Sequence, residues 1–215
     1  MYNSINTKND VIKESYIFNS ELDGEYGFPK LDSIHANLEE LRPVSFNNAI
    51  KEKYPRECVC HFFIEDMSFE RLWNNCDKYI DTLQNFKYVC TPDFSFYSDM
   101  PKSMQIWQTY RNRALGYYLS TYGMNIIPTV GWGFEDSFEW CFDGLPKNST
   151  LAVSTNGCFS KSGENCYKRG FEEMCNRLKP YNVLVVGKEI EVNTNIPIIY
   201  MDSYGQQMSK RLKGE

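Results

Sequence analysis

The alternation of short apolar runs with helical patterns, from Cys58 to the C-terminus, most constrains how this chain can fold. Helical spacing of apolar residues is clearest over residues 164–178. The strands predicted between such segments cover residues 59–64, 88–91, 125–129, 150–154, 183–186 and 198–200. Strands joined by helices are typically parallel, and near-continuous apolar strands are covered on both faces. The sequence therefore predicts an α/β fold with a mostly parallel sheet of five or six strands, open or partial-barrel-like.

The first 57 residues lack this alternation. We expect an irregular N-terminal arm and cap over residues 1–57, and an α/β domain over residues 58–215 that forms one globular unit with the cap. Pro29, Pro43 and Pro55 restrict the backbone of the cap, which leaves one short predicted helix over residues 46–51. At the other end, the charged residues 209–215 are predicted to be frayed.

The charge and composition exclude several classes of protein. A net charge of −5 argues against a broad nucleic-acid-binding surface. No apolar run reaches the roughly 18 residues that a membrane span needs, and the N-terminus lacks the charged and apolar regions of a signal peptide. We therefore expect a cytoplasmic protein with no membrane partner, in which the eight cysteines are reduced and mostly buried. Cys58, Cys60 and His61 are not expected to hold a metal, because a strand directs His61 to the opposite face.

Several ordered motifs resemble a known family. They occupy residues 60–66, 69–75, 92–95, 99–101, 105–107, 109–113, 127–132 and 141–147. Together they are similar to the DUF4417 family, a domain of unknown function found in bacteria, their phages and mobile elements. The resemblance covers roughly residues 26–190 and implies a phage or mobile-element setting. It supplies no catalytic residue that could be assigned to a position in this chain.

Carboxylates follow the first two predicted strands. Glu65 and Asp66 close the first strand, and Asp93 and Ser95 close the second. Because neighbouring parallel strands end at the same edge of a sheet, we expect these four residues to meet there. Three interpretations stay open: they cap helices or bind arginine, they bind a ligand, or they act as acid and base or hold magnesium.

The remaining predicted ligand-binding residues follow later in the chain. Arg111 falls on the apolar face of a long helix and therefore needs a partner, for which Asp66 or Asp93 is expected, either as a structural ion pair or as an anion clamp. Trp132 stands between two glycines and is either a stacking platform or a packed loop residue. Ser154, Asn156 and Lys188 follow the later strands at the same expected edge.

Motifs of common enzyme classes are absent. The sequence has no phosphate-binding P-loop, no dinucleotide-binding glycine motif and no nucleophile elbow, and it contains two histidines. Catalytic residues and cofactor therefore stay unassigned, and whether the protein is an enzyme stays open.

Three functional hypotheses remain. The leading one is binding of a small polar, nucleotide-like ligand at the carboxyl ends of the strands, through Glu65, Asp66, Asp93, Ser95, Arg111, Trp132, Ser154, Asn156 and Lys188. The second is a carboxylate-dependent hydrolase, assisted by magnesium. The third is an interaction protein that acts on a host protein. All three depend on the strand ends converging at one edge.

Overall fold

The computed structural model describes residues 10–214, and its centre is formed by parallel strands. Four strands form one sheet in the order β3 (Arg42–Ser45), β4 (Cys58–His61), β5 (Tyr88–Cys90) and β6 (Ile126–Ile127). Three strands form a second sheet in the order β7 (Thr150–Ser154), β8 (Asn182–Val186) and β9 (Ile198–Met201). Every pair within these two sheets is parallel, and the six predicted strands correspond to β4 through β9. The predicted α/β fold is confirmed.

A single bridge connects the two sheets. Thr129, just after β6, pairs in parallel with Ala152 of β7. The amide of Val130 donates to the carbonyl of Ala152 at 2.9 Å, and the amide of Ala152 donates to the carbonyl of Pro128 at 2.8 Å. The strands therefore run in sequence order from β3 to β9 across both sheets.

The connected strands curl around an apolar interior. One face of the strands contributes a single buried cluster, with members from both sheets: Val59, Tyr88, Cys90, Ile127, Ala152, Leu184, Val186 and Met201. Gln207, six residues after β9, also donates to the carbonyl of Pro43 in β3 at 3.1 Å, which brings the two edges of the strand array near each other, so the arrangement is a partial barrel. Within residues 10–214, β3 and β9 are not paired with each other, and the barrel stays open.

A segment before β3 crosses the amino-terminal end of this partial barrel. The amide of Thr150 donates to the carbonyl of Ile34 at 2.7 Å, and the side chain of Asn182 donates to the carbonyl of Ala36 at 3.2 Å. Ala36 and Leu38 are buried in the interior cluster. This segment therefore fills the amino-terminal end, and the carboxyl ends of the strands are left to form a site.

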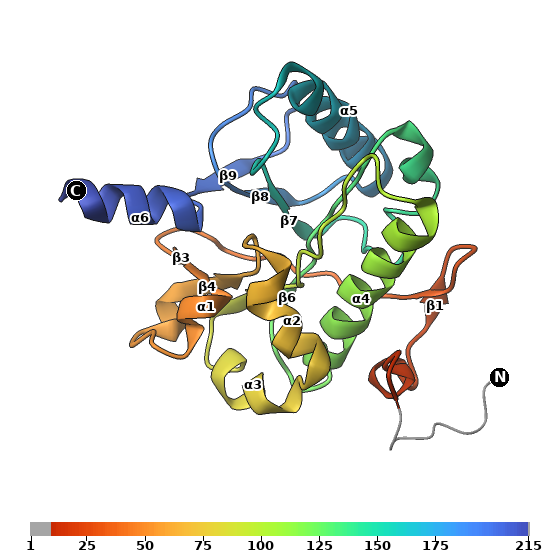
Figure 1. Ribbon diagram of the computed structural model, residues 1–215, viewed down its shortest axis with the longest axis horizontal. Helices are drawn as coiled ribbons and strands as arrows, with labels where there is room; N and C mark the ends of the chain where they lie inside the picture. The colour runs from red at the N-terminus through yellow and green to blue at the C-terminus, as the bar shows by residue number, and fades with distance from the viewer. Residues whose placement is uncertain (1–9, 215) are drawn as a thin grey trace.

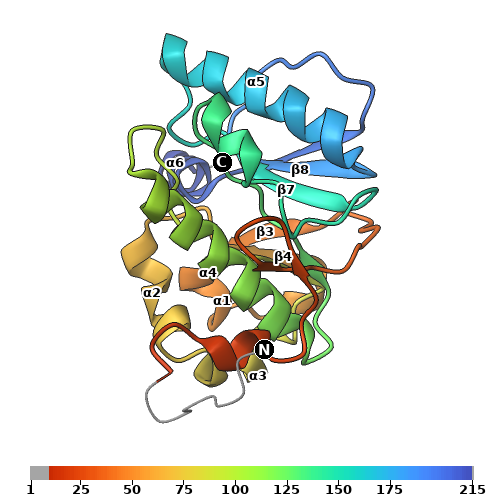
Figure 2. The same ribbon diagram turned by 90° about the vertical axis from the view of Figure 1, so that its right-hand side faces the viewer.

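Helices cover the outer face of the strands (Figures 1 and 2). The first sheet is covered by α1 (Phe46–Ala49), α2 (Asp66–Asn74), α3 (Asp77–Leu83) and α4 (Lys102–Ser120), and the second by α5 (Lys161–Leu178). Two outer apolar clusters lie beneath them. The last helix, α6 (Tyr204–Lys213), extends away from the body and has no buried residue. No helix within residues 10–214 combines the length and apolar composition needed to cross a membrane.

The N-terminal region is more regular than predicted. It contains a 3₁₀ helix (Glu14–Ile17), an antiparallel pair of β1 (Leu22–Asp23) and β2 (Phe28–Pro29), and the strand β3. The sequence prediction missed β3 because proline normally interrupts strands. Here Pro43 lies in an edge strand, where one side of the backbone needs no partner. The part of the predicted arm before residue 10 lies outside the described residues.

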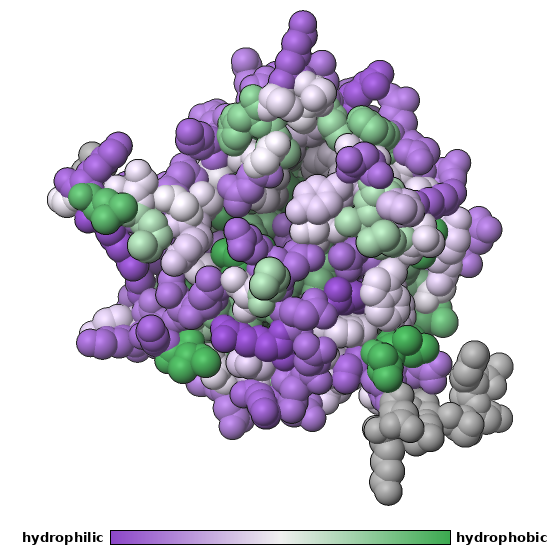
Figure 3. Space-filling view, in the orientation of Figure 1, coloured by the Kyte–Doolittle hydropathy of each residue, from purple (hydrophilic) through white to green (hydrophobic). Residues whose placement is uncertain are grey.

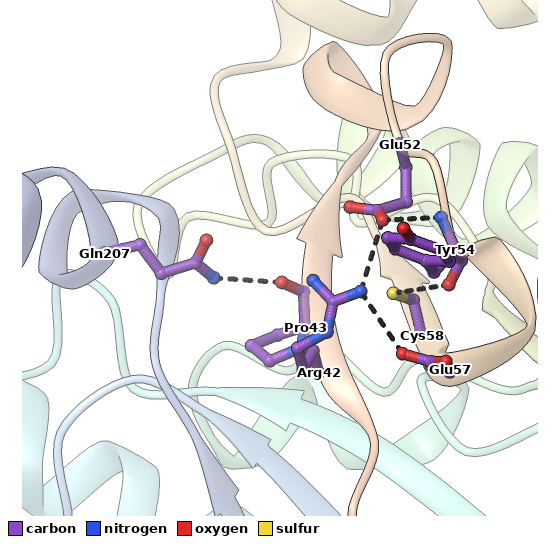
Figure 4. A network of polar contacts seen from close by, with 7 residues as sticks. All are labelled: Arg42, Pro43, Glu52, Tyr54, Glu57, Cys58 and Gln207. Carbon is purple, nitrogen blue, oxygen red and sulfur yellow. Dashed lines mark hydrogen bonds and ion pairs between the residues drawn. The ribbon is translucent and has the colours of Figure 1, made fainter.

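Side chains attach β3 to its surroundings (Figure 4). Arg42 donates to Glu52 at 3.2 Å and lies 3.9 Å from Glu57. On the other side of the strand, the Gln207 amide of α6 donates to the carbonyl of Pro43 at 3.1 Å. The bond from Gln207 places the first turns of α6 next to β3.

Several predicted helix boundaries were wrong. The first turn of α5 begins at Lys161, with Ser160 as its N-cap, three residues before the predicted start at Glu164. Residues 209–213, predicted to be frayed, belong to α6, which begins with a capping box formed by Ser203 and Gln206. All eight cysteines are free in the structure, and five of them are buried, in agreement with the expected mostly buried thiols.

Candidate functional site

A cavity of about 890 Å³ lies at the carboxyl ends of the strands. The segments that follow β3, β4, β5, β6, β7 and β9 all contribute to its wall, together with the first residues of α5 and α6. Six of the nine predicted ligand-binding residues line it: Glu65, Asp93, Ser95, Trp132, Ser154 and Asn156. The expected convergence of the strand ends is therefore present.

Asp93 is a polar residue of the cavity whose side chain has no partner among residues 10–214. It follows β5 and is half-buried, and its carboxylate makes no hydrogen bond or ion pair with the residues that the structure describes. Burial, reinforced by the negative charge of nearby Asp66, raises the pKa of Asp93 to about 7. A carboxyl group in this state is available to a ligand and changes its charge near neutral pH.

Asp66 lies behind the wall of the cavity and holds it in place. The amide of Ser95 lies 3.1 Å from both carboxylate oxygens of Asp66, and the Ser95 hydroxyl donates to one of them at 2.8 Å. Asp66 is also the first residue of α2, where a negative charge is favourable. It fixes the loop that carries Asp93, and its hydrogen-bonding capacity is largely used within the protein.

Trp132 is both packed and exposed to the cavity. Its indole nitrogen donates to the carbonyl of Cys166 at 3.2 Å, and its ring lies 5.7 Å from that of Tyr167. Gly170 of α5 permits this approach, because a Cβ there would lie 2.1 Å from the indole nitrogen. The packed loop residue of the sequence analysis is therefore present, and the indole also lines the cavity.

The segment after β7 forms another part of the wall. The Ser154 hydroxyl donates to the carbonyl of Val186 at 3.0 Å and accepts from the amide of Asn156 at 3.1 Å. The side-chain amide of Asn156 reaches the carbonyl of Phe63 at 3.5 Å, which connects the second sheet to the segment after β4. These bonds position the exposed Asn156 side chain at the cavity.

The expected partners of Arg111 were wrong. Arg111 on α4 pairs with Glu70 of α2, and its guanidinium lies 3.8 Å from the centre of the Phe94 ring. Glu70 lies one helical turn after Asp66 in α2. The ion pair therefore joins α2 to α4, and neither of its residues lines the cavity. The observed geometry corresponds to the structural ion pair of the sequence analysis, with a different acid.

Lys188 also lies outside the cavity. The hydroxyl of Thr155 donates to its carbonyl at 2.7 Å, and Gly187 before it has a φ of 135° and packs against Thr155. The Lys188 ammonium lies 5.7 Å from the ring centre of Phe159. The turn after β8 thus directs Lys188 away from the cavity that six of the other predicted residues line.

A buried cation, Arg113, joins α4 to the loop after the 3₁₀ helix at Glu135–Glu139. Its side chain is 2% exposed and donates to the carbonyls of Asp143, at 3.0 Å, and Cys141, at 2.8 Å. A further bond reaches the side chain of neighbouring Asn112. Burial lowers the pKa of Arg113 to about 10, so it stays charged at neutral pH. This network supports the helix that packs beneath the site.

Comparison with known proteins identifies the family. The domain of unknown function DUF4417 matches residues 20–203. The chain belongs to the DUF4417 family. Its relatives include the Gene 1 protein of Mycobacterium phage L5, which is 37% identical over 129 residues, 60% of this chain and 56% of that protein. The Gene 1 protein of Mycobacterium phage D29 is 35% identical over 129 residues, 60% of this chain and 48% of that protein.

The chain spans about half the length of these DUF4417 relatives. No solved structure matches it. The family and its occurrence in phages agree with the resemblance found in the motifs.

Some residues of this DUF4417 cavity were missed by sequence reasoning. Aromatic side chains after β5 and β6 line it, as do hydroxyl groups at the first turns of α5 and α6: Phe96, Tyr97, Phe134, Ser160, Ser162, Ser203 and Tyr204. The Ser203-x-x-Gln206 pattern was a signal for the start of α6. The aromatic residues carried no comparable signal, because buried and exposed aromatic residues look alike in a single sequence.

Within residues 10–214, no three His, Cys, Asp or Glu side chains gather closely enough to hold a metal ion. What the DUF4417 cavity offers is carboxylate acceptors, hydroxyl groups, backbone amides at helix N-termini and aromatic surfaces.

Proposed function

We propose that this DUF4417 protein binds a small polar molecule, of about nucleotide size, in the cavity at the carboxyl ends of its strands. The observation that carries the proposal is the convergence of Asp93, Trp132 and Asn156, from the segments after β5, β6 and β7, on one cavity of about 890 Å³. Ligand sites typically have volumes of about 300 to 1,000 Å³ and contain a few well-placed polar groups among apolar ones.

The cavity divides into polar and apolar parts with different roles. Asp93 and Glu65 accept hydrogen bonds from hydroxyl or amino groups of the ligand, and Asn156 both donates and accepts. Trp132 supplies a flat apolar surface that its bond to Cys166 already orients. Because bonds within the protein hold Trp132 and Asn156, these two side chains need little ordering when a ligand enters.

The surface of this side of the molecule supports a small-molecule site. In the space-filling view of Figure 3, hydrophilic side chains predominate, and apolar ones form separate small groups. A stable protein interface usually has a contiguous, largely apolar core. A recessed ligand site needs no such patch.

A thermal-shift screen with nucleosides, nucleotides, sugars and amines tests the proposal. We expect at least one compound to raise the melting temperature of the wild type. The shift should be reduced in Asp93→Asn and in Tyr97→Ala, since both residues line the cavity. The matched controls are Asp81→Asn and Tyr122→Ala, which alter exposed residues outside the cavity. Equal shifts in all five proteins, or no shift with any compound, would contradict the proposal.

A carboxylate-dependent hydrolase is the second candidate. The observation that favours it is the pKa of Asp93, raised to about 7, because a general acid or base works best when its pKa lies near the working pH. In this case, Asp93→Asn should lose turnover of a bound compound while the compound still raises the melting temperature. If Asp93→Asn loses both the turnover and the rise in melting temperature, Asp93 has a binding role alone.

A further inference from the structure

The charge of the cavity restricts the ligand further. Glu65 and Asp93 line the cavity, and Asp66 lies directly behind its wall. None of the lining residues is Lys, Arg or His. The two cations that the sequence assigned to anionic groups, Arg111 and Lys188, both lie outside. The side chains that line the cavity therefore carry negative charge and no positive charge.

Helix N-termini do not reverse this balance. The helices α2, α5 and α6 all begin at the cavity, and each N-terminus carries the equivalent of about half a positive charge. Together the three N-termini are equivalent to roughly one and a half positive charges, which is less than the negative charge of the three carboxylates Glu65, Asp66 and Asp93. In addition, Ser160 and Ser203 already accept the third amide of α5 and α6, which reduces the number of free donors.

The unpaired acceptor and the aromatic residues indicate the shape and polarity of the ligand. The Asp93 carboxylate has no hydrogen-bond donor among residues 10–214, so a ligand that donates satisfies a half-buried group. Trp132, Phe96 and Tyr97 also line the cavity, and their rings can contact a flat molecule. A ring with N–H donors matches both features, and a phosphate group matches neither.

We infer that the cavity accepts a planar nitrogenous ring with N–H donors and no phosphate group, such as a nucleobase or nucleoside. This inference rests on the proposed function of the same cavity. Asp93 accepts the N–H groups at the edge of the ring, and Trp132 contacts its face. A phosphate on the same ligand is repelled by Glu65 and Asp93. The ligand class is thus narrower than a small polar molecule, and it excludes nucleotides.

Paired titrations test this inference. Adenosine, cytidine and guanosine are each compared with their 5′-monophosphates by isothermal titration calorimetry at pH 8, where Asp93 is ionised. We expect at least one nucleoside to bind about tenfold more tightly than its monophosphate, equivalent to about 1.4 kcal/mol. Asp93→Asn should lower the affinity for that nucleoside, whereas Asp81→Asn should leave the affinity unchanged. Equal or tighter binding of the monophosphates would overturn the inference.

The outcomes separate this inference from the proposed function. If no nucleoside binds but a sugar or an aliphatic amine raises the melting temperature through Asp93, the proposed function stands and the inference is wrong. If no compound of any class raises the melting temperature, the proposed function and the inference are both wrong. If a nucleoside binds with equal affinity to the wild type and Asp93→Asn, the assignment of Asp93 as its acceptor is wrong.

Discussion

Asp93 is the residue whose environment differs most from that of an ordinary surface carboxylate. Its pKa is raised from 3.8 to about 7, first by burial and then by the charge of Asp66. The folded protein therefore binds this proton more tightly than the unfolded chain does. The stability that results is present at low pH and is lost as the pH rises from about 4 through about 7.

This linkage gives a measurable pH dependence. The free energy of unfolding of the wild type, minus that of Asp93→Asn, should fall between pH 4 and pH 8. We expect a change on the order of 2 kcal/mol, since each tenfold change in proton affinity is worth about 1.4 kcal/mol and water in the open cavity screens the charge. Urea denaturation of both proteins at several pH values measures it.

His61 acts in the opposite direction, and the subtraction removes its effect. Burial lowers the pKa of His61 from 6.5 to about 4, so its contribution to stability is lost as the pH falls from about 6.5 towards 4. Both proteins retain His61. Asp81→Asn serves as the control for a simple loss of charge. A difference between wild type and Asp93→Asn that does not vary with pH would contradict this account of Asp93.

Arg113 gives a second prediction at the scale of a residue. Arg113→Met leaves the carbonyls of Cys141 and Asp143 without their donor, and we expect a loss of about 3 kcal/mol in the free energy of unfolding. The matched control is Arg169→Met, which removes an exposed ion pair with Glu135 and should change stability by less than about 0.5 kcal/mol. Chemical denaturation compares the two, and equal effects would show that the buried network adds no stability.

The indole of Trp132 packs closely against α5 at Gly170, which has no side chain. Gly170→Ala normally favours a helix by about 1 kcal/mol, but here the new methyl group meets the indole of Trp132. We therefore expect Gly170→Ala to lower stability by about 2 kcal/mol and to change the tryptophan fluorescence. Gly205→Ala in α6 is the control, because a Cβ there meets nothing within 4 Å. A stabilised Gly170→Ala protein would contradict the observed packing.

At the scale of elements, the strands β4 to β9 could be predicted, whereas β3 and the exact directions of side chains could not. The meeting of Asp93, Trp132 and Asn156 follows from strand polarity alone, because parallel strands end at one edge. The partner of Arg111 depends on how α2 and α4 pack together, and a difference of one helical turn replaced Asp66 by Glu70. The direction of Lys188 depends on the backbone turn at Gly187. Neither property is encoded in the spacing of a single sequence.

For the whole molecule, the partial barrel has a rigid centre and a peripheral helix. All five residues of β8 are buried and lie between β7 and β9, whereas α6 has no buried residue. We expect amide hydrogen exchange to be slowest in β7 and β8 and fastest in α6, because exchange reports the cost of local opening. Equal protection of α6 and β8 would show that α6 is held more firmly than its contacts indicate.

The central claim, that the strand ends form a ligand site, is tested most directly by indole resonances in a nitrogen-15 NMR titration with nucleosides. The chain has four tryptophans, and Trp132 is the one that lines the cavity. Its indole N–H bonds to the carbonyl of Cys166 and reports on this wall of the site. We predict that the Trp132 indole signal shifts with a saturable dependence on ligand, while those of Trp73, Trp107 and Trp140 stay in place. Saturable binding that leaves the Trp132 signal unchanged and shifts another tryptophan would contradict the account.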